Sequence, residues 1–419
     1  MLNKQGIREL AYVVRIDNIE PIIGSDNCEA AVVGGWKIMV RKNVFKAGDL
    51  AIYFEIDSQV PASDTFAFLA AKHYKVKSQR YTFGGKGNFI SQGLLMHPTD
   101  FGWFYYQDGD GQQYIHNREK NVSYPVGTFL TEELKVTYAD PADNKRKAPS
   151  ADKYKRMAQR NPKLFKKRPI RWLMKRKWGK KLLFLFFGKK RDVRSAWPAW
   201  VVKTDEERIQ NLVDRIPEFA QEEWIATEKI DGTSTTFTMR KNLKKRLFSS
   251  KDTESILVCS RNVCFDKPDK QCFYETNVYT EMAEKYHMEN VLRELLREST
   301  KDVIFITIQG ETYGGEIQKR NYSTSEHYLA CFNLIFGFAD GTTERANPEQ
   351  MKLILTKYGL ECVPIIGRVT LPNTCDGILA LAGGVSKIDG LPREGLVFRS
   401  LDGKKSFKAV DNNFLLQYH

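Results

Sequence analysis

The stretch EKIDGTSTTF, residues 228–237, decides how the second half of the chain is interpreted. Lys229 stands two residues before an acid, Asp231, and three before a glycine, Gly232, and short hydroxylated residues follow. A surface lysine needs no such neighbours. An amine attacks phosphorus only when it is neutral, and partial burial with nearby cations can lower the pKa of lysine from about 10.4. KIDG alone predicts a surface turn equally well.

Five further motifs follow in a fixed order. Each supplies one polar or aromatic residue on or beside an expected strand. They are Arg261 in VCSRN, Glu311 in IQGETYGGEIQKRNY, Phe332 in YLACFNLIFG, Glu394 in LPREGLVFRS and Lys408 in KKSFKAV. A bound nucleotide needs an aromatic platform, a carboxylate for ribose, cations for phosphate and a carboxylate for a metal. Each residue alone also fits a core position, a surface ion pair or a strand edge, but the six together favour a nucleotide site.

Length and composition limit the remaining choices. The 419 residues predict two or three domains, with 42% apolar and 28% charged residues, as in ordinary globular proteins. Seven cysteines without a CxxC pair and six histidines without ligand spacing argue against zinc and disulfides and favour a reducing cytosol. MLNKQGIREL lacks the apolar core of a signal peptide. The longest apolar run, Leu182 to Phe187, is too short to span a bilayer.

The positive charge is concentrated in one segment. Residues 145–194 hold 21 Lys and Arg against two acids, a net +19, and the rest of the chain is −5 because 44 basic residues face 49 acidic ones. Aromatic residues lie among these charges, so polyanion contact is favoured over a solvated linker, and attachment to a membrane surface is the least favoured alternative. The candidate polyanion contacts in this basic connector are Lys175, Arg176, Lys177, Lys180 and Lys181.

The sequence predicts an α+β protein in three parts. Residues 1–140 are β-rich, with expected strands at 11–19, 30–40, 50–57 and 89–96, and favour an OB-like β-barrel. Residues 141–195 form the basic connector. Residues 196–419 are expected to form one domain of antiparallel sheets and helices. It begins with a helix over 203–216, which Thr204 would cap, and has a second helical segment over 282–298.

The six motifs resemble those of the covalent nucleotidyltransferases, which include RNA ligases, DNA ligases and mRNA capping enzymes. The resemblance is closer to ATP-dependent RNA ligases of the Deinococcus and Naegleria type, which have an OB domain in front of the catalytic domain. KTDEERIQN and the GE…G…IQ…NY spacing over residues 310–322 carry this closer likeness, and FKAGDLAIYFEIDSQVP and ISQGLL resemble the N-terminal domain. The likeness covers nearly the whole chain apart from the basic connector.

The resemblance implies a role for each motif. Lys229 would attack the α-phosphorus of ATP to give lysyl-AMP, and AMP would then activate a 5′-phosphate end for sealing to a 3′-hydroxyl. The other residues would bind nucleotide and metal: Glu228 against the adenine amino group, Phe332 stacked on the ring, Arg261 and Glu311 on ribose, Lys408 on the AMP phosphate, Asp231 and Gly232 within the nucleotide-binding loop, and Glu394 on Mg²⁺ or Mn²⁺. The last motif of the family often has two lysines one residue apart. Here Ser406 and Val410 flank Lys408 at that spacing, so a second phosphate contact is in doubt.

Rival interpretations differ in the nucleic acid that is joined and in whether the protein is catalytically active. DNA ligases and capping enzymes carry an OB domain after the last motif, and only 11 residues follow Lys408, which disfavours both. A nucleic-acid-binding protein with an inactive ligase fold would have lost the lysine or a metal carboxylate, and neither is lost. We therefore expect a cytoplasmic, monomeric RNA ligase. Its substrate could be a nicked duplex, an RNA/DNA hybrid, free ends or a break in a tRNA.

Overall fold

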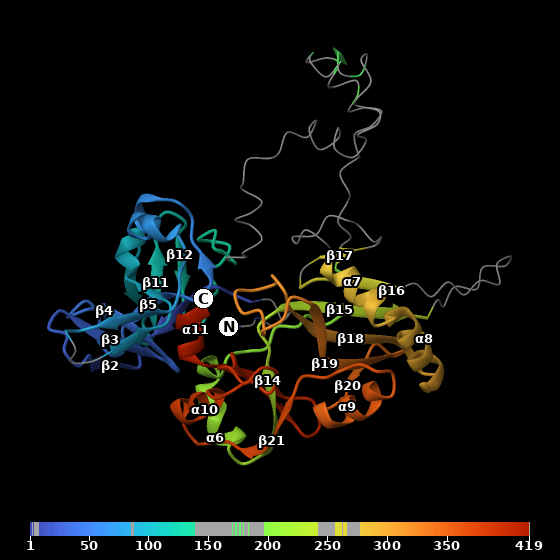
Figure 1. Cartoon of the computed structure of the whole chain (residues 1–419). Helices are drawn as coiled ribbons and strands as arrows, with labels where there is room; N and C mark the ends of the chain where they lie inside the picture. Colours follow the sequence, from blue (N-terminus) through green and yellow to red (C-terminus); the bar gives the residue numbers. More distant parts are fainter. Residues whose placement is uncertain are drawn as a thin grey trace. The chain divides into compact units, whose positions relative to one another are not determined.

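A computed structural model gives the fold of the chain (Figure 1). It describes residues 1, 3, 8–84, 88–138, 197–241, 256–261, 263–265 and 277–418, together with positions 170, 172, 173, 176, 179 and 183. The chain divides into two units, Met1–Tyr138 with Trp197–His419, and Ala139–Ala196. The secondary structure below belongs to the first unit, which contains all of the motifs except the basic connector.

Two three-stranded antiparallel sheets form the centre of the N-terminal part. Their orders are β1-β5-β9 and β2-β3-β4. Alternate residues of β1 and β5 enter two different cores: Val13 and Ile52 pack in one cluster, and Val14 and Tyr53 in the other. A strand that is buried on both faces is expected where a sheet curls into a barrel. The bounds are β1 (Ala11–Arg15), β2 (Asn18–Pro21), β3 (Cys28–Val33), β4 (Trp36–Arg41), β5 (Leu50–Phe54) and β9 (Leu94–Met96).

The strand expected over 89–96 is two strands. β8 ends at Ser91 and β9 begins at Leu94. Gly93 between them has a φ of 97°, and a Cβ there would collide with the Tyr53 ring, so the chain turns at this glycine. The remaining elements of this part are β6 (Ser58–Gln59), η1 (Asp64–Lys72), β7 (Gln79–Thr82), β8 (Asn88–Ser91), η2 (Pro98–Phe101), β10 (Phe104–Gln107), β11 (Gln113–Asn117), β12 (Val122–Tyr124) and β13 (Thr137–Tyr138).

Two antiparallel sheets form the C-terminal part. A four-stranded sheet has the order β21-β14-β22-β23, and a six-stranded sheet has the order β17-β16-β15-β18-β19-β20. The chain passes from the first sheet to the second between β14 and β15, through the motif around Lys229. The strands are β14 (Glu223–Lys229), β15 (Thr233–Arg240), β16 (Ile256–Cys259), β17 (Cys264–Phe265), β18 (Val303–Gly314), β19 (His327–Phe338), β20 (Thr343–Arg345), β21 (Ile365–Thr370), β22 (Gly395–Ser400) and β23 (Ser406–Val410).

Helices cover one face of the six-stranded sheet. Leu292 and Leu295 of α8 lie in the same buried cluster as Ile306 and Ile308 of β18. The single helical segment expected over 282–298 is two helices, because His287 between them has a φ of 49° and ends the helical path. The helices of the C-terminal part are α6 (Ile216–Phe219), α7 (Val278–Lys285), α8 (Met288–Glu298), α9 (Pro348–Thr356), α10 (Cys375–Ala382) and α11 (Asn412–Tyr418).

The helix predicted over 203–216 is wrong. The segment contains two 3₁₀ turns, η3 (Ile209–Asn211) and η4 (Val213–Arg215), and then the short α6. Its backbone groups bond outside the segment: the Glu207 carbonyl accepts the Lys408 amide, and the Gln210 carbonyl accepts the Gly35 amide. Its apolar side chains still enter one core, since Ile209 and Ile216 pack with Trp224 and Phe407. The apolar spacing indicated burial correctly, but it did not indicate the backbone conformation.

Candidate active site

Lys229 is the last residue of β14, where the two sheets of the C-terminal part meet. Its strand pairs with β22 so that Lys229 lies opposite Gly395, and this register brings the adjacent Glu394 alongside it. Gly232 directly precedes β15. A larger residue would not fit there, because a Cβ at this position would collide with the Thr312 carbonyl of β18. Ser234 in turn pairs with Glu311. Strand register therefore gathers residues that are far apart in the sequence.

The amine of Lys229 lies among buried carboxylates. Its Nζ donates a hydrogen bond of 2.7 Å to Glu394 Oε2, and both side chains are largely buried. Burial alone would lower the pKa of Lys229, but the charges of Glu394 and Glu311 outweigh it and raise the pKa. Burial, with repulsion from Glu394, raises the pKa of Asp231 to about 7 and that of Glu311 to about 8. The site therefore holds a protonated amine in an acidic setting, and the cationic neighbours expected to lower its pKa are outweighed.

Glu228 has a free acceptor inside the protein. The side chain is 1% exposed, and its Oε2 accepts the Lys387 amide at 2.8 Å. The other oxygen, Oε1, is buried and has no hydrogen-bond partner among the described residues. A buried carboxylate oxygen without a donor is costly, so this atom is suited to accept an N–H from a ligand.

A β-bulge turns the side chain of Phe332 toward Ile230, the residue that follows Lys229 in the chain. In the ladder between β18 and β19, Gln309 pairs with Asn333 and Gly310 pairs with Cys331, so Phe332 is the extra residue. The side chains of β19 change face at this point: Leu334 packs in the helix-covered core, whereas Phe332 packs in a separate small cluster with Ile230 and Tyr322. Arg399 donates to the Phe332 carbonyl at 2.6 Å, which satisfies the group that the bulge removes from the ladder.

Arg261 and Lys408 are brought together through an acid that the sequence analysis did not select. Asp205 accepts from Arg261 Nη2 at 2.6 and 2.7 Å and lies 4.0 Å from Lys408 Nζ. Burial, together with the neighbouring cations Arg8, Arg208 and Lys229, lowers the pKa of Lys408 to about 7, although Asp205 opposes this. Asp205 was assigned to the first turn of the helix that does not form, so no sequence signal separated it from a capping residue.

Arg208 is a second residue that sequence reasoning missed. Its side chain is 8% exposed, and it forms a parallel bridge with Lys408. Asp57 lies 4.0 Å from its Nη2, whereas Nε and Nη1 are buried without a hydrogen-bond partner among the described residues. A buried guanidinium with unsatisfied donors is suited to bind an anion. The expected helix would have placed this arginine on a solvated face, which hid it.

Arg320 and Tyr322 of the RNY motif support the loops around the lysine. Arg320 pairs with Asp389 at 2.5 Å, both buried, and its Cζ lies 4.3 Å from the centroid of the Tyr322 ring. The hydroxyl of Tyr322 accepts the Asp231 amide at 2.7 Å. Arg320 thus links the loop that carries Lys387 to the loop after Lys229. The sequence contained both residues in a quoted motif but gave no role for them.

The metal prediction rests on Glu394 alone. Among the described residues, no group of three His, Cys, Asp or Glu is placed to hold a metal ion. Mg²⁺ usually binds through one or two carboxylates plus substrate phosphates and water, so a single carboxylate beside a phosphate site is compatible with it. The acid-rich surroundings of Lys229 fit the same demand, because a cation would relieve the repulsion that raises the pKa values of Asp231 and Glu311.

The proposed RNA contacts of the connector lie outside the described residues, apart from Arg176. Its guanidinium carbon lies 4.2 Å from the centroid of the Trp172 ring, and that tryptophan is 50% exposed. Lys175, Lys177, Lys180 and Lys181 have no described position. No helix within the described ranges has the length and apolar character needed to span a membrane.

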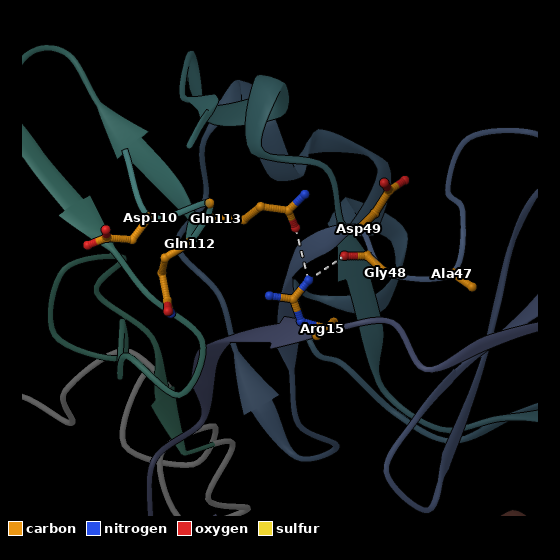
Figure 2. Close-up of a pocket in the computed structure, with 8 residues that line it drawn as sticks. Arg15, Ala47, Gly48, Asp49, Asp110, Gln112 and Gln113 are labelled. Carbon is orange, nitrogen blue, oxygen red and sulfur yellow. Dashed lines mark hydrogen bonds between the residues drawn. The ribbon is translucent and has the colours of Figure 1, made fainter. Parts of the chain in front are cut away.

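A polar pocket of about 510 Å³ lies in the N-terminal part, and none of the predicted site residues lines it. Figure 2 shows Arg15 between the loop 47–49 and the hairpin 110–113. Arg15 Nη1 donates to the Gly48 carbonyl and to Gln113 Oε1, both at 2.9 Å. Its charge is therefore used in joining two loops.

Comparison with known proteins agrees with this geometry. Residues 222–410 match the family model for RNA ligase, and residues 10–97 match the model for an OB-fold domain. A ligand-free mutant of the Naegleria gruberi RNA ligase is 25% identical, with a TM-score of 0.68 over 98% of this chain and 99% of that chain. The second half of the chain therefore contains an RNA ligase domain, and the N-terminal part contains an OB-fold domain. The predicted order, an OB-fold domain followed by an α+β ligase domain, is confirmed.

Other structures of the same Naegleria ligase also align with this chain over nearly its full length. A mutant with ATP and manganese is 24% identical, with a TM-score of 0.68, and covers 99% of both chains. The complex with pyrophosphate is 25% identical, with a TM-score of 0.68 over 98% of this chain and 99% of that chain. No curated protein sequence matches the chain significantly.

Proposed function

We propose that the protein is an ATP-dependent RNA ligase in which Lys229 carries AMP between ATP and a 5′-phosphorylated RNA end. The observation that carries this proposal is the 2.7 Å hydrogen bond from Lys229 to Glu394 at the end of β14. Glu228, whose Oε1 has no partner among the described residues, directly precedes this lysine, and the bulged Phe332 packs with Ile230, which directly follows it. An inactive ligase fold would not need to retain Lys229, Glu228 and Phe332 together.

In the first step, Lys229 loses a proton to solvent and its neutral Nζ attacks the α-phosphorus of ATP. A P–N bond forms, the bond to the β-phosphate oxygen breaks, and pyrophosphate leaves. The 5′-phosphate of RNA then takes AMP from the lysine, and a 3′-hydroxyl displaces AMP to seal the strand. Glu228 Oε1 would accept the adenine amino group, and Phe332 would stack on the base.

The phosphates would meet the cations on the other side of Lys229. Lys408 and Arg208 would contact them, and Arg261 and Glu311 would hold the ribose. Glu394 would hold Mg²⁺ or Mn²⁺, which neutralises phosphate charge as the leaving group departs. The pairing of Glu394 with the protonated lysine would have to be exchanged for these contacts before attack, because only the neutral amine is nucleophilic.

We further propose a cytoplasmic, monomeric enzyme that acts on a break in a nicked RNA or RNA/DNA duplex. The six cysteines that the structure describes are free, which agrees with a reducing compartment. The three-part division into residues 1–140, 141–195 and 196–419 also remains a proposal. In it the basic connector contributes phosphate contacts from Lys175, Arg176, Lys177, Lys180 and Lys181.

Sealing of defined nicks tests the proposed function. With ATP and Mg²⁺ or Mn²⁺, we expect the protein to seal a nick with an RNA 3′-hydroxyl at least about tenfold faster than an otherwise identical all-DNA nick. Product formation on a denaturing gel measures both rates, and omission of ATP is the control. Equal or faster sealing of the DNA nick would overturn the assignment to RNA.

Phe332→Ala is expected to weaken ATP binding by about 5- to 150-fold, because base stacking on an aromatic side chain contributes about 1–3 kcal/mol. Phe338→Ala on the same strand is the matched control, since Phe338 packs against the helix-covered core. Equilibrium binding of a fluorescent ATP analogue measures the effect. Equal ATP affinity in the wild type and Phe332→Ala would mean that Phe332 serves packing alone.

Replacing the five basic residues of the connector with glutamine is expected to weaken RNA binding and to flatten its salt dependence. Each phosphate contact contributes a slope of about 0.7 to 0.9 log units of affinity per log unit of salt. Lysyl-AMP formation should be unchanged, because ATP binds among residues of the ligase domain. The exposed pair Lys352 and Lys357, changed to glutamine, is the control. If the salt dependence of RNA binding is unchanged in the glutamine variant, the connector has another role. If the wild type binds lipid vesicles and the glutamine variant does not, the connector is a membrane anchor.

A further inference from the structure

The sheet formed by β10, β11 and β12 carries a row of aromatic rings on one face. Cross-strand pairing puts Phe104 opposite His116 and Tyr106 opposite Tyr114. Ring centroids are 4.9 Å apart for Phe104–His116, 6.0 Å for Tyr106–His116 and 6.1 Å for Tyr106–Tyr114. The guanidinium carbon of Arg118 lies 4.4 Å from the centroid of the Phe104 ring. Four rings therefore form a continuous row with a planar cation at one end.

The opposite face of the same sheet is the one that packs in the core. Ile115 and Tyr124, which pair with each other, are buried there with Trp103. Tyr105 lies on the same inner face, and its hydroxyl donates to the Leu50 carbonyl at 2.8 Å. A sheet with one core face normally presents polar side chains on the other. Here Tyr106 is 46% exposed within an aromatic row, so this outer face is built for something other than solvation.

Hydrogen bonds fix the edges of the outer rings. Tyr114 donates to Asp108 Oδ2 at 2.8 Å, and His116 Nδ1 lies 2.9 Å from Ser123 Oγ. The ring planes are thus held in place before any partner arrives, which reduces the entropy lost on binding. The strand residues of this face are aromatic, apart from Ser123, and include no aliphatic side chain. This composition suits flat, polar-edged nucleobases better than the apolar side chains of a protein partner.

We propose that the outer face of β10–β12 is a stacking platform for unpaired bases of the RNA substrate, with Tyr106 and Tyr114 at its centre and Arg118 at its end. The inference rests on the proposed RNA ligase function. It concerns residues 104–124, which lie beyond the residues 10–97 that match the OB-fold model. Binding here adds affinity for a single-stranded flank of the break without reading its sequence, because every base has a stacking face.

The test compares three variants of the full chain. Tyr106→Leu with Tyr114→Leu removes the rings but keeps apolar bulk, and Tyr106→Phe with Tyr114→Phe keeps the rings. Phe68→Ala is the control for an exposed aromatic residue elsewhere in the same part, since Phe68 is 60% exposed. The probes are a single-stranded RNA and an RNA of the same length with abasic ribose at every position, and fluorescence anisotropy measures their binding.

We expect the leucine variant to bind the single-stranded RNA about fivefold or more weakly, and Phe68→Ala to bind it like the wild type. The phenylalanine variant keeps the rings but loses the hydrogen bond from Tyr114 to Asp108, so it should bind this RNA more tightly than the leucine variant. The salt slope of the leucine variant should stay parallel to that of the wild type, because stacking releases no counterions. The wild type should prefer the RNA with bases over the abasic RNA, and the leucine variant should lose most of that preference.

Equal RNA affinity in the leucine variant and the wild type would overturn the proposal and leave a protein partner as the occupant of this face. A wild type that binds both RNAs equally would overturn it too. Lysyl-AMP formation is measured on the same samples. If the wild type forms lysyl-AMP while the leucine variant binds RNA normally, only the platform fails. If the wild type forms no lysyl-AMP, the ligase function fails whatever the platform binds.

Discussion

Lys229→Ala is expected to abolish covalent labelling of the protein by ATP that is labelled at its α-phosphate. The label survives a denaturing gel only as a covalent adduct, and the variant has no amine at the end of β14 to form the P–N bond. Lys405→Ala is the matched control: this lysine lies just before β23 and forms ion pairs with Glu218 and Glu222, away from the carboxylates around Lys229. It should be labelled like the wild type.

A second substitution separates lost chemistry from lost folding. Lys229→Ala leaves the buried Glu394 without its partner, which can destabilise the protein. Lys229→Arg keeps a cation beside Glu394, but a guanidinium stays protonated and cannot attack phosphorus. Both variants should bind ATP, and neither should take up label. Labelling of a folded Lys229→Arg variant would show that another residue is the nucleophile.

The proximity of Lys229 and Glu394 follows from the sequence because both lie at strand ends. Glu394 directly precedes β22, and Lys229 ends β14, so antiparallel pairing of two neighbouring strands is enough to bring them together. The strand-like pattern after Glu394 located β22. Knowing which strands are neighbours is enough to place these two residues side by side.

The bulge at Phe332 could not be predicted in the same way. The sequence placed Phe332 correctly within a strand. It gave no reason for the side chains of that strand to switch from one face of the sheet to the other. The change depends on Gly310 pairing with Cys331 and on Arg399 reaching the freed carbonyl of Phe332, and both contacts are long-range. Local patterns carry no information on either.

The helix predicted around Arg208 was wrong for a related reason. Its apolar residues have helical spacing, yet its carbonyl groups are taken by Lys408 and by the hairpin at Gly35. Tertiary hydrogen bonds thus take the place of helical ones. The charged residues between the apolar residues therefore do not all face solvent, as they would on a helix. Asp205 and Arg208 became part of the site through that replacement.

The affinity for ATP is expected to fall as the pH rises from 7 to 9, and Lys408 is expected to be the main cause. Burial lowers its pKa to about 7 in the free protein. A bound phosphate would favour the charged form and raise that pKa, so binding takes up a proton. Below pH 7 the amine is already charged and affinity is at its highest. Above it, affinity falls by up to about tenfold per pH unit, until the pH reaches the pKa in the complex.

Lys408→Arg isolates this contribution, because arginine stays charged throughout the range. Asp231 and Glu311 also lose protons between pH 7 and 9, and their added negative charge weakens ATP binding in the same direction. The variant should therefore keep a shallow pH dependence, and the wild type should show a steeper one. Binding of an ATP analogue that cannot be cleaved between its α- and β-phosphates measures affinity without lysyl-AMP formation. Identical pH profiles for the two proteins would mean that Lys408 is charged before ATP arrives, and that its burial beside Asp205 and Arg208 does not set the affinity.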